Sequence, residues 1–330
     1  MKVCIAGAGA IGAFIGTRLA LAGESQVSVL ARGATLAAIR QHGLRLQQAG
    51  ELHAAPVAAS DNAADLGVQD VVVIAVKGPA LAAVADACRP LIGPHTLLLP
   101  AMNGVTWWFG AGCAAIGDAP LQSIDPGGRI AAALPLAQVI GCVVHASVAT
   151  EGGGLARHVM GQGLIIGEPI PDQTGGPSER VATLAALLQR AGFECTASAD
   201  IRRDIWFKLW GNMTMNPVTA LTGATVDKVL DDPLTRHFCS QAMLEAQAVG
   251  ARIGCAIDQT PEDRHAIARK LGAFKTSMLQ DVEANRPVEL EALVGAVREL
   301  AQRVGVATPT IDTLYGLARL QARVRGLLPG

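Results

Sequence analysis

The spacing of apolar residues divides the chain into two regions with different predicted secondary structure. In residues 1–200, short apolar runs alternate with helix-like segments, and these runs predict strands over 2–6, 26–30, 71–75, 96–99 and 139–144. The run 71–75 (VVVIA) is apolar at every position, which is typical of a parallel strand covered on both faces. After residue 200 the spacing indicates helices alone. We therefore predict an α/β domain over residues 1–200 and an all-α domain over residues 201–330.

Glycine and proline residues mark several predicted element boundaries. Glycines flank the stretches 155–160 and 164–166, which predicts an antiparallel hairpin at the edge of the sheet. A helix is predicted over 178–191. Three pairs of a capping residue and a proline predict the starts of later helices, namely Asp232-Pro233, Thr260-Pro261 and Thr308-Pro309.

The first predicted strand leads directly into a glycine-rich turn, Gly7-Ala8-Gly9-Ala10-Ile11-Gly12, and a helix-like run over 13–22 follows. This order of strand, turn and helix is the context that a dinucleotide-binding fingerprint requires. Gly7 permits the tight turn, Gly9 lets the backbone approach a pyrophosphate, and Gly12 lets the helix pack close to the strand. The helix N-terminus then offers free N–H groups to the phosphates. The turn therefore predicts that the chain binds a dinucleotide.

The end of the second predicted strand indicates which dinucleotide is bound. In NAD-binding units, an Asp or Glu about 20 residues after the glycine turn accepts hydrogen bonds from the ribose hydroxyls. This chain has Leu30-Ala31-Arg32-Gly33 there, without a carboxylate. The forked guanidinium of Arg32 can pair with a 2′-phosphate. An ordinary surface arginine is the alternative interpretation, but the absence of the acid favours NADP.

Three polar residues share one face of an otherwise apolar helical segment in the second region. The segment 206–216 reads WFKLWGNMTMN, and Lys208, Asn212 and Asn216 are spaced four apart, which places them on one stripe. Apolar neighbours remove water from the lysine and lower its pKa, which makes it a usable proton donor near neutral pH. The two amides can hold a polar ligand without adding charge. The alternative is a lysine that reaches solvent and two amides bonded to nearby backbone.

Composition and charge exclude several classes of protein. The chain has 330 residues, more than a single core usually holds, and a formal net charge of −1 without a basic cluster, so we expect no nucleic-acid partner. No apolar run reaches about 18 residues and the first strand occupies the N-terminus, so we expect neither a membrane span nor a signal peptide. The seven cysteines are scattered without a CxxC pair, which indicates reduced thiols and a cytoplasmic location. No metal-ligand spacing is present, so no metal site is expected.

Several separate motifs together resemble the ketopantoate reductase (2-dehydropantoate 2-reductase) family over nearly the whole chain. They are GAGAIG at 7–12, Arg32, Val76-Lys77, Asn103-Gly104, His145-Ala146, Lys208-Leu209 with Asn212 and Asn216-Pro217, Ser277-Met278-Leu279-Gln280-Asp281, and Glu289. The resemblance implies an α/β Rossmann domain followed by an all-α domain like the C-terminal domain of 6-phosphogluconate dehydrogenase. It also implies reduction of the ketone of 2-dehydropantoate to (R)-pantoate with NADPH, on the route to pantothenate and coenzyme A.

The resemblance also implies roles for the matching positions. It places Gly7 to Gly12, Arg32 and Lys77 on the cofactor, with Asn103 between the nicotinamide ribose and the substrate. Lys208 would be the proton donor, and Glu289 would touch cofactor or substrate near the reacting carbon. The other implied ligands are Asn212, Asn216 and Ser277 for the substrate and, by position, Ser147 for the cofactor. From the residues alone, Ser277 could instead bond its own helix backbone, and Glu289 could complement a helix dipole.

Two departures from the family pattern leave the substrate open. Between Asn103 and Gly141 the chain is longer than the compact family members, and this insertion contains Trp107-Trp108-Phe109. In addition, Val294 precedes Gly295 where the family usually has Asn. We expect the aromatic run to pack within its loop, and a cage over the substrate is the alternative.

Three functions therefore remain open at this point. They are reduction of 2-dehydropantoate, reduction of another 2-keto acid, and binding of NADP without turnover. The intact stripe of Lys208, Asn212 and Asn216 argues against a protein that only senses NADP. A small-molecule 2-keto acid is the expected substrate, and the oligomeric state is open, a homodimer included.

Overall fold

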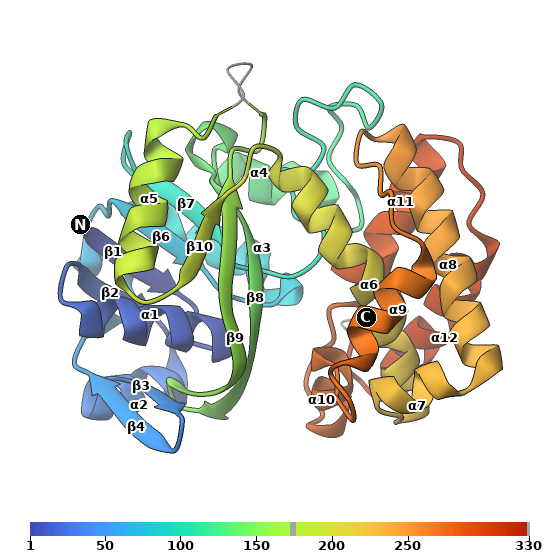
Figure 1. Cartoon of the computed structure of the whole chain (residues 1–330). Coiled ribbons are helices and arrows are strands. Elements are labelled where there is room, and N and C mark those ends of the chain that lie inside the picture. The colour runs from blue at the N-terminus through green and yellow to red at the C-terminus, as the bar shows by residue number, and fades with distance from the viewer. Residues whose placement is uncertain (172–175, 329–330) are drawn as a thin grey trace. The chain divides into compact units, whose positions relative to one another are not determined.

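The computed structural model describes residues 1–171 and 176–328. The chain forms two compact units, whose elements are labelled in Figure 1. Unit 1 consists of Met1–Met102 and Gly128–Asp204, and unit 2 consists of Asn103–Gly127 and Ile205–Gly330. The segment 103–127 therefore belongs to unit 2, although the residues before and after it in the sequence belong to unit 1.

Five parallel strands form the first sheet of unit 1, in the order β5-β2-β1-β6-β7. The strands are β1 (Lys2–Ala6), β2 (Gln26–Leu30), β5 (Ala58–Ser60), β6 (Val71–Ile74) and β7 (Leu97–Pro100). Helices of this part are α1 (Ala10–Ala22), α2 (Gly33–His42) and α3 (Gly78–Cys88). All four residues of β6 are buried, as its apolar run predicts. The strand order is that of a Rossmann mononucleotide-binding unit, which confirms the predicted α/β class.

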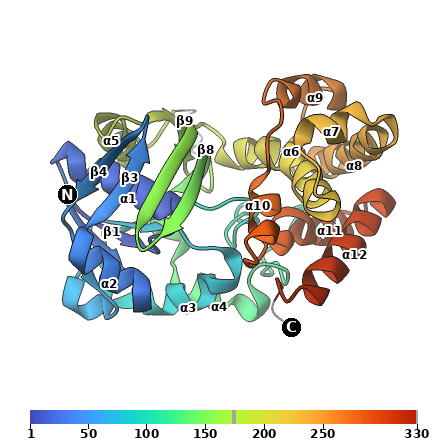
Figure 2. The same cartoon turned by 90° about the horizontal axis from the view of Figure 1, so that it is seen from below.

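A second, mixed sheet completes unit 1. Its order is β10-β9-β3-β4, with β8 paired to β9. The strands are β3 (Leu44–Gln48), β4 (Glu51–Ala55), β8 (Gly141–Gly152), β9 (Leu155–Gly167) and β10 (Glu194–Ala197). The two long strands β8 and β9 run side by side in Figure 2. The other helical segments of the first 200 residues are α5 (Glu179–Arg190), α4 (Arg129–Ala133), η1 (Ala63–Leu66), η2 (Arg89–Leu91), η3 (Pro126–Gly128) and η4 (Leu136–Gln138).

Helix α1 packs between the two sheets of unit 1. At Gly16, a Cβ atom would come within 2.6 Å of Leu44 Cδ1 in β3 and 2.9 Å of Ile5 Cγ1 in β1. Phe14 and Ile15 are fully buried. A helix covered on both sides needs no polar face, which explains why α1 is apolar nearly all round. This packing fixes the N-terminus of α1 at the glycine turn.

The predicted hairpin between 155–160 and 164–166 is wrong. Both stretches belong to the single strand β9, which pairs antiparallel with β8. Gly161 lies inside this strand with a φ of +72°, and a Cβ on it would lie 2.5 Å from His145 O. The glycine therefore marks an irregularity within the ladder, where the register shifts, rather than a turn. The predicted strand 139–144 is also displaced, because β8 begins at Gly141 and lies in the second sheet.

Apart from the irregular segment 103–127, unit 2 is built from helices, which confirms the all-α class predicted for residues 201–330. They are α6 (Ile201–Thr222), which begins in unit 1, α7 (Val226–Asp231), α8 (Pro233–Arg252), α9 (Pro261–Arg269), α10 (Ser277–Glu283), the π turn η5 (Glu291–Gly295), α11 (Ala296–Arg303) and α12 (Pro309–Val324). The predicted starts at Pro233, Pro261 and Pro309 are confirmed. Asp232 accepts from two backbone N–H groups of α8, and Thr260 forms a capping box with Asp263.

The packing of α6 against α8 sets the direction in which the polar stripe points. Trp206 and Trp210 of α6 are among the largest fully buried side chains. Trp210 Nε1 donates to Met243 O in α8 at 2.8 Å. A Cβ on Gly250 of α8 would lie 2.3 Å from Trp206 Nε1, so glycine leaves the space that this indole fills. Two large rings locked into α8 fix the rotation of α6 about its axis.

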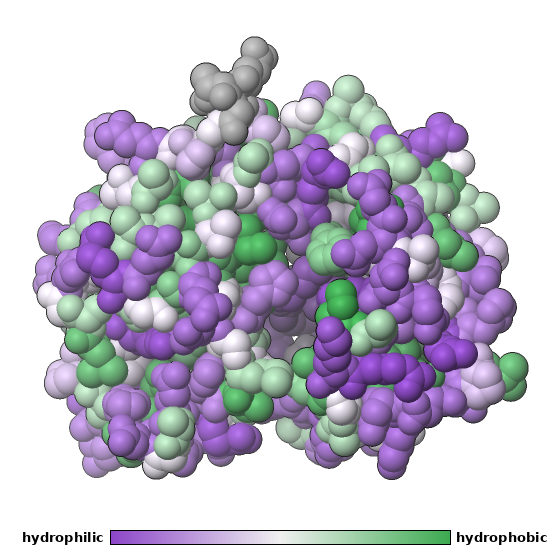
Figure 3. All heavy atoms as spheres, viewed as in Figure 1, coloured by the Kyte–Doolittle hydropathy of each residue, from purple (hydrophilic) through white to green (hydrophobic). Residues whose placement is uncertain are grey.

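The surface gives no sign of a large apolar patch on the face drawn in Figure 3, where hydrophobic residues are distributed among hydrophilic ones. The most exposed large hydrophobic side chains, Leu234 and Val324, lie on different helices. Within residues 1–171 and 176–328, no helix is long and apolar enough to cross a membrane.

Candidate active site

The glycine turn has the backbone shape that a pyrophosphate requires. Gly7 has a φ of +97°, and a Cβ on Gly12 would lie 1.9 Å from Gly7 O, so both positions need glycine. Beside Gly9, in contrast, a Cβ would meet nothing within 4 Å. Gly9 is the N-cap of α1, where no side chain caps the helix and the first turn contains no acid. The first N–H groups of α1 are therefore available to an anion, and the residues present fit the predicted dinucleotide.

Two basic residues follow the strands on either side of β1. The registers place Ala6 opposite both Leu30 of β2 and Ile74 of β6, so the three strands end together. Arg32 follows β2 and is exposed, and Lys77 follows β6 as the half-buried N-cap of α3. Open α/β sheets bind ligands at this carboxyl edge. The structure thus brings both predicted cofactor residues to the edge that carries the glycine turn.

The lysine of the stripe is held by a distant amide. Lys208 is half-buried, and its Nζ donates to Asn103 Oδ1 at 2.6 Å. Both residues belong to unit 2, although 105 positions separate them. A hydrogen bond this short restricts where the ammonium can lie. This geometry differs from the alternative in which the lysine extends into solvent.

The far end of the stripe meets the N-terminus of α10. Asn216 Nδ2 donates to Ser277 Oγ at 3.4 Å. The hydroxyls of Thr219 and Thr276, both buried, lie 2.7 Å apart and tie α6 to α10. Thr276 also caps α10 by accepting from Leu279 N. The Ser277 hydroxyl is therefore not the helix cap, and the structure brings it to Asn216, another predicted substrate residue.

Three other predicted site residues lie on the stripe, before the π turn and in the second sheet. Asn212 is half-buried on the same stripe. Glu289 is half-buried just before the π turn, and its carbonyl accepts from Leu293 N at 3.3 Å. At this position its carboxylate could also complement the helix dipole, which is the alternative role. Ser147 lies in β8 where the register with β9 shifts. The roles of these three residues remain predictions.

The aromatic run of the insertion is packed. Trp107, Trp108 and Phe109 are 7%, 3% and 0% exposed. The ring of Phe109 lies 6.1 Å from that of Trp206 in α6. Val294, the other departure from the family pattern, is 0% exposed. Burial favours loop packing over a substrate cage for the two tryptophans.

Glu299 and Arg303 of α11 form hydrogen bonds with residues 120–123 of the insertion, within unit 2. Glu299 Oε1 accepts from Gln122 N at 2.9 Å, and Oε2 accepts from Ser123 N and Oγ at 2.8 and 2.7 Å. Arg303 Nη2 donates to Glu299 at 2.7 Å and to Pro120 O at 2.6 Å. Burial alone would raise the pKa of Glu299, but these hydrogen bonds outweigh it and hold the pKa below its ordinary value.

The pair of Glu299 and Arg303 was not predicted from the sequence. Its one local signal is an i, i+4 spacing of Glu and Arg. That spacing is common on exposed helix faces, where it adds little to stability. The contacts that matter here reach across more than 170 positions of sequence.

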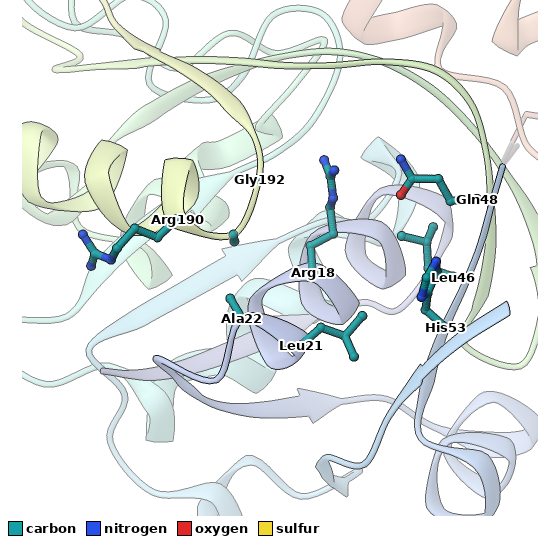
Figure 4. Close-up of a pocket in the computed structure, with 9 residues that line it drawn as sticks. Arg18, Leu21, Ala22, Leu46, Gln48, His53, Arg190 and Gly192 are labelled. Atoms are coloured by element: carbon teal, nitrogen blue, oxygen red, sulfur yellow. The ribbon is translucent and has the colours of Figure 1, made fainter. Parts of the chain in front are cut away.

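A pocket of about 310 Å³ lies in unit 1 at the end of α1 far from the glycine turn (Figure 4). Its lining comes from α1, β3, β4 and the end of α5, and contains none of the predicted site residues. The guanidinium of Arg18 lies over the rings of Phe14 and Phe193, and Arg190 is paired with Glu24. Both cations are thus engaged. Among the described residues, no cluster of three His, Cys, Asp or Glu could hold a metal ion.

Comparison with known proteins identifies the family. The model of the family "Ketopantoate reductase PanE/ApbA" matches residues 3–117, and that of "Ketopantoate reductase PanE/ApbA C terminal" matches residues 200–322. A curated 2-dehydropantoate 2-reductase of Mesorhizobium japonicum is 44% identical over 327 residues, which is 99% of each chain. The chain belongs to the ketopantoate reductase family. The resemblance inferred from the motifs is confirmed.

Solved structures of the family share both units. A protein of Ralstonia solanacearum MolK2, assigned as a ketopantoate reductase, is 56% identical with a TM-score of 0.94, and the match covers 99% of each chain. The 2-dehydropantoate 2-reductase of Geobacter metallireducens is 26% identical with a TM-score of 0.84, over 97% of this chain and all of the other. A D-mandelate dehydrogenase solved with NADH reaches a TM-score of 0.83 at 21% identity, which shows a shared fold alone.

Proposed function

We propose that the chain reduces the ketone of 2-dehydropantoate to (R)-pantoate with NADPH, a step toward pantothenate and coenzyme A. The bond between Lys208 Nζ and Asn103 Oδ1 carries the proposal, because it brings an ammonium on the predicted stripe to a second residue that the family resemblance assigns to the reaction. Membership of the ketopantoate reductase family and full-length similarity to a curated 2-dehydropantoate 2-reductase support the substrate. Residues 1–200 would bind NADP, and residues 201–330 would act on the substrate.

NADPH supplies the hydride for this reduction when it is bound. We assign the pyrophosphate to the glycine turn 7–12, the 2′-phosphate to Arg32 and the adenosine side to Lys77. The open space beside Gly9 and the uncapped start of α1 support the first assignment. The exposed guanidinium of Arg32, in a strand end without an acid, supports the second. Asn103, Ser147 and Glu289 complete the proposed cofactor ligands.

Lys208 is the proposed proton donor. As a hydride adds to the keto carbon, the electron pair of the C=O bond moves to the oxygen, which then needs a positive partner and a proton. The Lys208 ammonium stabilises this growing charge and transfers a proton to the oxygen, and the resulting amine takes up a proton from water. Asn103 holds Nζ in position by accepting one of its hydrogens. The proposed ligands of the substrate are Asn212, Asn216 and Ser277, with Glu289 beside the reacting carbon.

Reduction of a different 2-keto acid is the second candidate, because the chain carries the insertion after Asn103. The structure weakens this candidate. Trp107, Trp108 and Val294, which distinguish the chain from compact family members, are all buried. Buried residues alter packing more directly than they alter the choice of substrate.

We also propose that the protein is cytoplasmic and forms a homodimer. The seven cysteines, all among the described residues, form no disulfide, and all but Cys113 are buried. Burial raises the pKa of both Cys4 and Cys195 to about 11, which keeps these thiols protonated and unreactive. Cysteines outside disulfides fit a reducing compartment. Light scattering would report the oligomeric state.

Oxidation of NADPH with a panel of 2-keto acids tests the proposed function. We expect kcat/KM for 2-dehydropantoate to exceed that for other branched 2-keto acids by at least about tenfold, a discrimination worth roughly 1.4 kcal/mol. A preference for another acid in the panel would support the second candidate. Tight binding of NADPH without turnover of any acid would indicate a protein that only senses the nucleotide.

A further inference from the structure

We propose that Glu291 and Tyr315 are positioning residues for the reaction: together they hold the π turn Glu291–Gly295, whose backbone fixes Asn103 and, through it, the ammonium of Lys208. This inference rests on the proposed function, because it concerns the proton donor of that reaction. Neither residue belongs to the motifs that carry the family resemblance.

The π turn stands where the helical core of unit 2 meets the loop that carries Asn103. It occupies Glu291–Gly295 and continues into α11. A π turn shifts helical hydrogen bonding from i→i+4 to i→i+5, which is rare and occurs mostly as a single turn within a helix, often at functional sites. One carbonyl of this turn is used outside the helix, because Ala292 O accepts from Val105 N at 2.9 Å. The π turn therefore also binds the loop that carries Asn103.

The contact between the π turn and the loop leaves little freedom. Gly104 has a φ of +80°, and a Cβ on it would lie 2.4 Å from Ala292 O and 2.7 Å from Ala292 C. Only glycine permits this approach of two backbones. Asn103 immediately precedes Gly104, and its Oδ1 lies 2.6 Å from Lys208 Nζ. The π turn thus contacts the loop at Gly104, through the close approach of the two backbones, and at Val105, through the hydrogen bond to Ala292 O. A displacement of the π turn would therefore also displace Asn103, which precedes Gly104.

The side chain of Glu291 ties the π turn to α12. Its Oε1 accepts from the hydroxyl of Tyr315 at 2.8 Å. Its Oε2 fills the place beside Gly295, where a Cβ would come within 2.1 Å. The guanidinium carbons of Arg298 and Arg319 lie 4.6 and 5.2 Å from the centre of the Tyr315 ring, and these cation–π contacts help to fix the ring. Burial, followed by the bond to Glu291, raises the pKa of Tyr315, so the phenol remains a donor.

The replacement Tyr315→Phe removes only the hydroxyl that donates a hydrogen bond to Glu291. A misplacement of a reacting group by about 1 Å can slow a reaction by about 10²-fold. The loss of one hydrogen bond should displace the Lys208 ammonium by less than this and should slow the reaction less. We expect single-turnover hydride transfer to 2-dehydropantoate, with NADPH bound beforehand, to slow by about tenfold while the Kd of NADPH changes less than twofold. Glu291→Gln keeps an oxygen that accepts from Tyr315, so its rate should stay within about threefold of wild type.

A matched control separates positioning from a general loss of stability. Leu314 is 1% exposed on the same helix, and Leu314→Val should lower the melting temperature without touching the bond between Tyr315 and Glu291. Its hydride-transfer rate should equal that of wild type. An equal slowing in Leu314→Val and Tyr315→Phe would overturn the inference, as would a wild-type rate in Tyr315→Phe.

A double-mutant cycle tests whether Tyr315 acts through Asn103. If it does, Tyr315→Phe should have no further effect on hydride transfer in an Asn103→Ala background, because the group that it positions is absent. Independent effects that multiply in the double variant would show that Tyr315 does not act through Asn103 and would overturn the inference.

Hydrogen exchange of the Val105 amide gives a readout that needs no substrate. This amide donates to Ala292 O, so it should exchange faster in Tyr315→Phe than in wild type or Leu314→Val. Unchanged exchange at Val105 would overturn the positioning role. Failure of the wild type to reduce 2-dehydropantoate would instead contradict the proposed function, so the two failures are distinguishable.

Discussion

Replacement of Glu299 by Gln should weaken the hydrogen bonds between α11 and the insertion and lower the stability of unit 2. Each carboxylate oxygen accepts two hydrogen bonds, at 2.7–2.9 Å, from Gln122 and Arg303 on one side and from Ser123 on the other. A glutamine of the same shape keeps one oxygen but turns an NH₂ group toward two donors. The donors that face the NH₂ group lose their acceptor, and the bonds that remain have a neutral amide oxygen in place of a carboxylate oxygen.

The expected loss is large enough to measure by thermal unfolding. Hydrogen bonds to charged groups contribute about 1.5–3 kcal/mol each, so the loss of two of them costs at least about 3 kcal/mol. For a unit of this size, that lowers the Tm by roughly 6–12 °C. Glu283→Gln is the matched control, because it makes the same change in unit 2 at an exposed pair with Lys275. Its Tm should stay within about 2 °C of wild type.

The same carboxylate makes the difference depend on pH. The pKa of Glu299 in the folded chain is held below its value in the unfolded chain. Its stabilisation is therefore fully present above the unfolded pKa of about 4.3 and is lost as the pH falls through the folded pKa. The free-energy gap between wild type and Glu299→Gln should narrow below about pH 4. A Tm within about 2 °C of wild type at pH 7, or a gap that is constant from pH 7 down to about pH 3, would refute this reasoning.

Two further predictions concern the cofactor and the insertion. Arg32→Ala should weaken NADPH binding by about 10- to 150-fold and leave NADH nearly unchanged, because a charge-assisted pair is worth about 1.5–3 kcal/mol; equal losses for both cofactors would show that Arg32 does not contact the 2′-phosphate. Trp108→Ala should lower the Tm while the substrate KM stays unchanged, because Trp108 is buried. A raised KM, with indole fluorescence that responds to substrate in the wild type, would favour the substrate cage instead.

Elements with a strong local signal could be predicted from the sequence. The run Lys2–Ala6 before the glycine turn is apolar, and Asp232 and Thr260 are capping residues placed directly before prolines. Strands β3 (LRLQQ) and β4 (ELHAA) were missed because neither has a continuous apolar run, and each is buried at only one or two positions. The false hairpin arose because the sequence does not distinguish a glycine in a turn from one, such as Gly161, inside an irregular strand.

The candidate site divides in the same way between local and distant information. The stripe of Lys208, Asn212 and Asn216 follows from helical spacing alone, since residues four apart share a face. The partner of Lys208 lies 105 positions away, and only the family resemblance placed Asn103 near the reaction. The contacts of Glu291 and Glu299 were missed because they depend on how α11, α12 and residues 103–127 pack, which no local pattern records.

Single-turnover reduction of 2-dehydropantoate by NADPH bound beforehand, in wild type and Lys208→Ala, tests the central claim most directly. Lys208 acts on charge that develops only as the hydride transfers, so its loss should slow this step and leave NADPH binding within about twofold. General acid catalysis contributes about 10²–10⁴-fold, which is roughly 3–5 kcal/mol of barrier, so we expect the folded variant to react at least about a hundredfold more slowly. A rate within about fivefold of wild type would contradict the account and make Glu289 the next candidate donor.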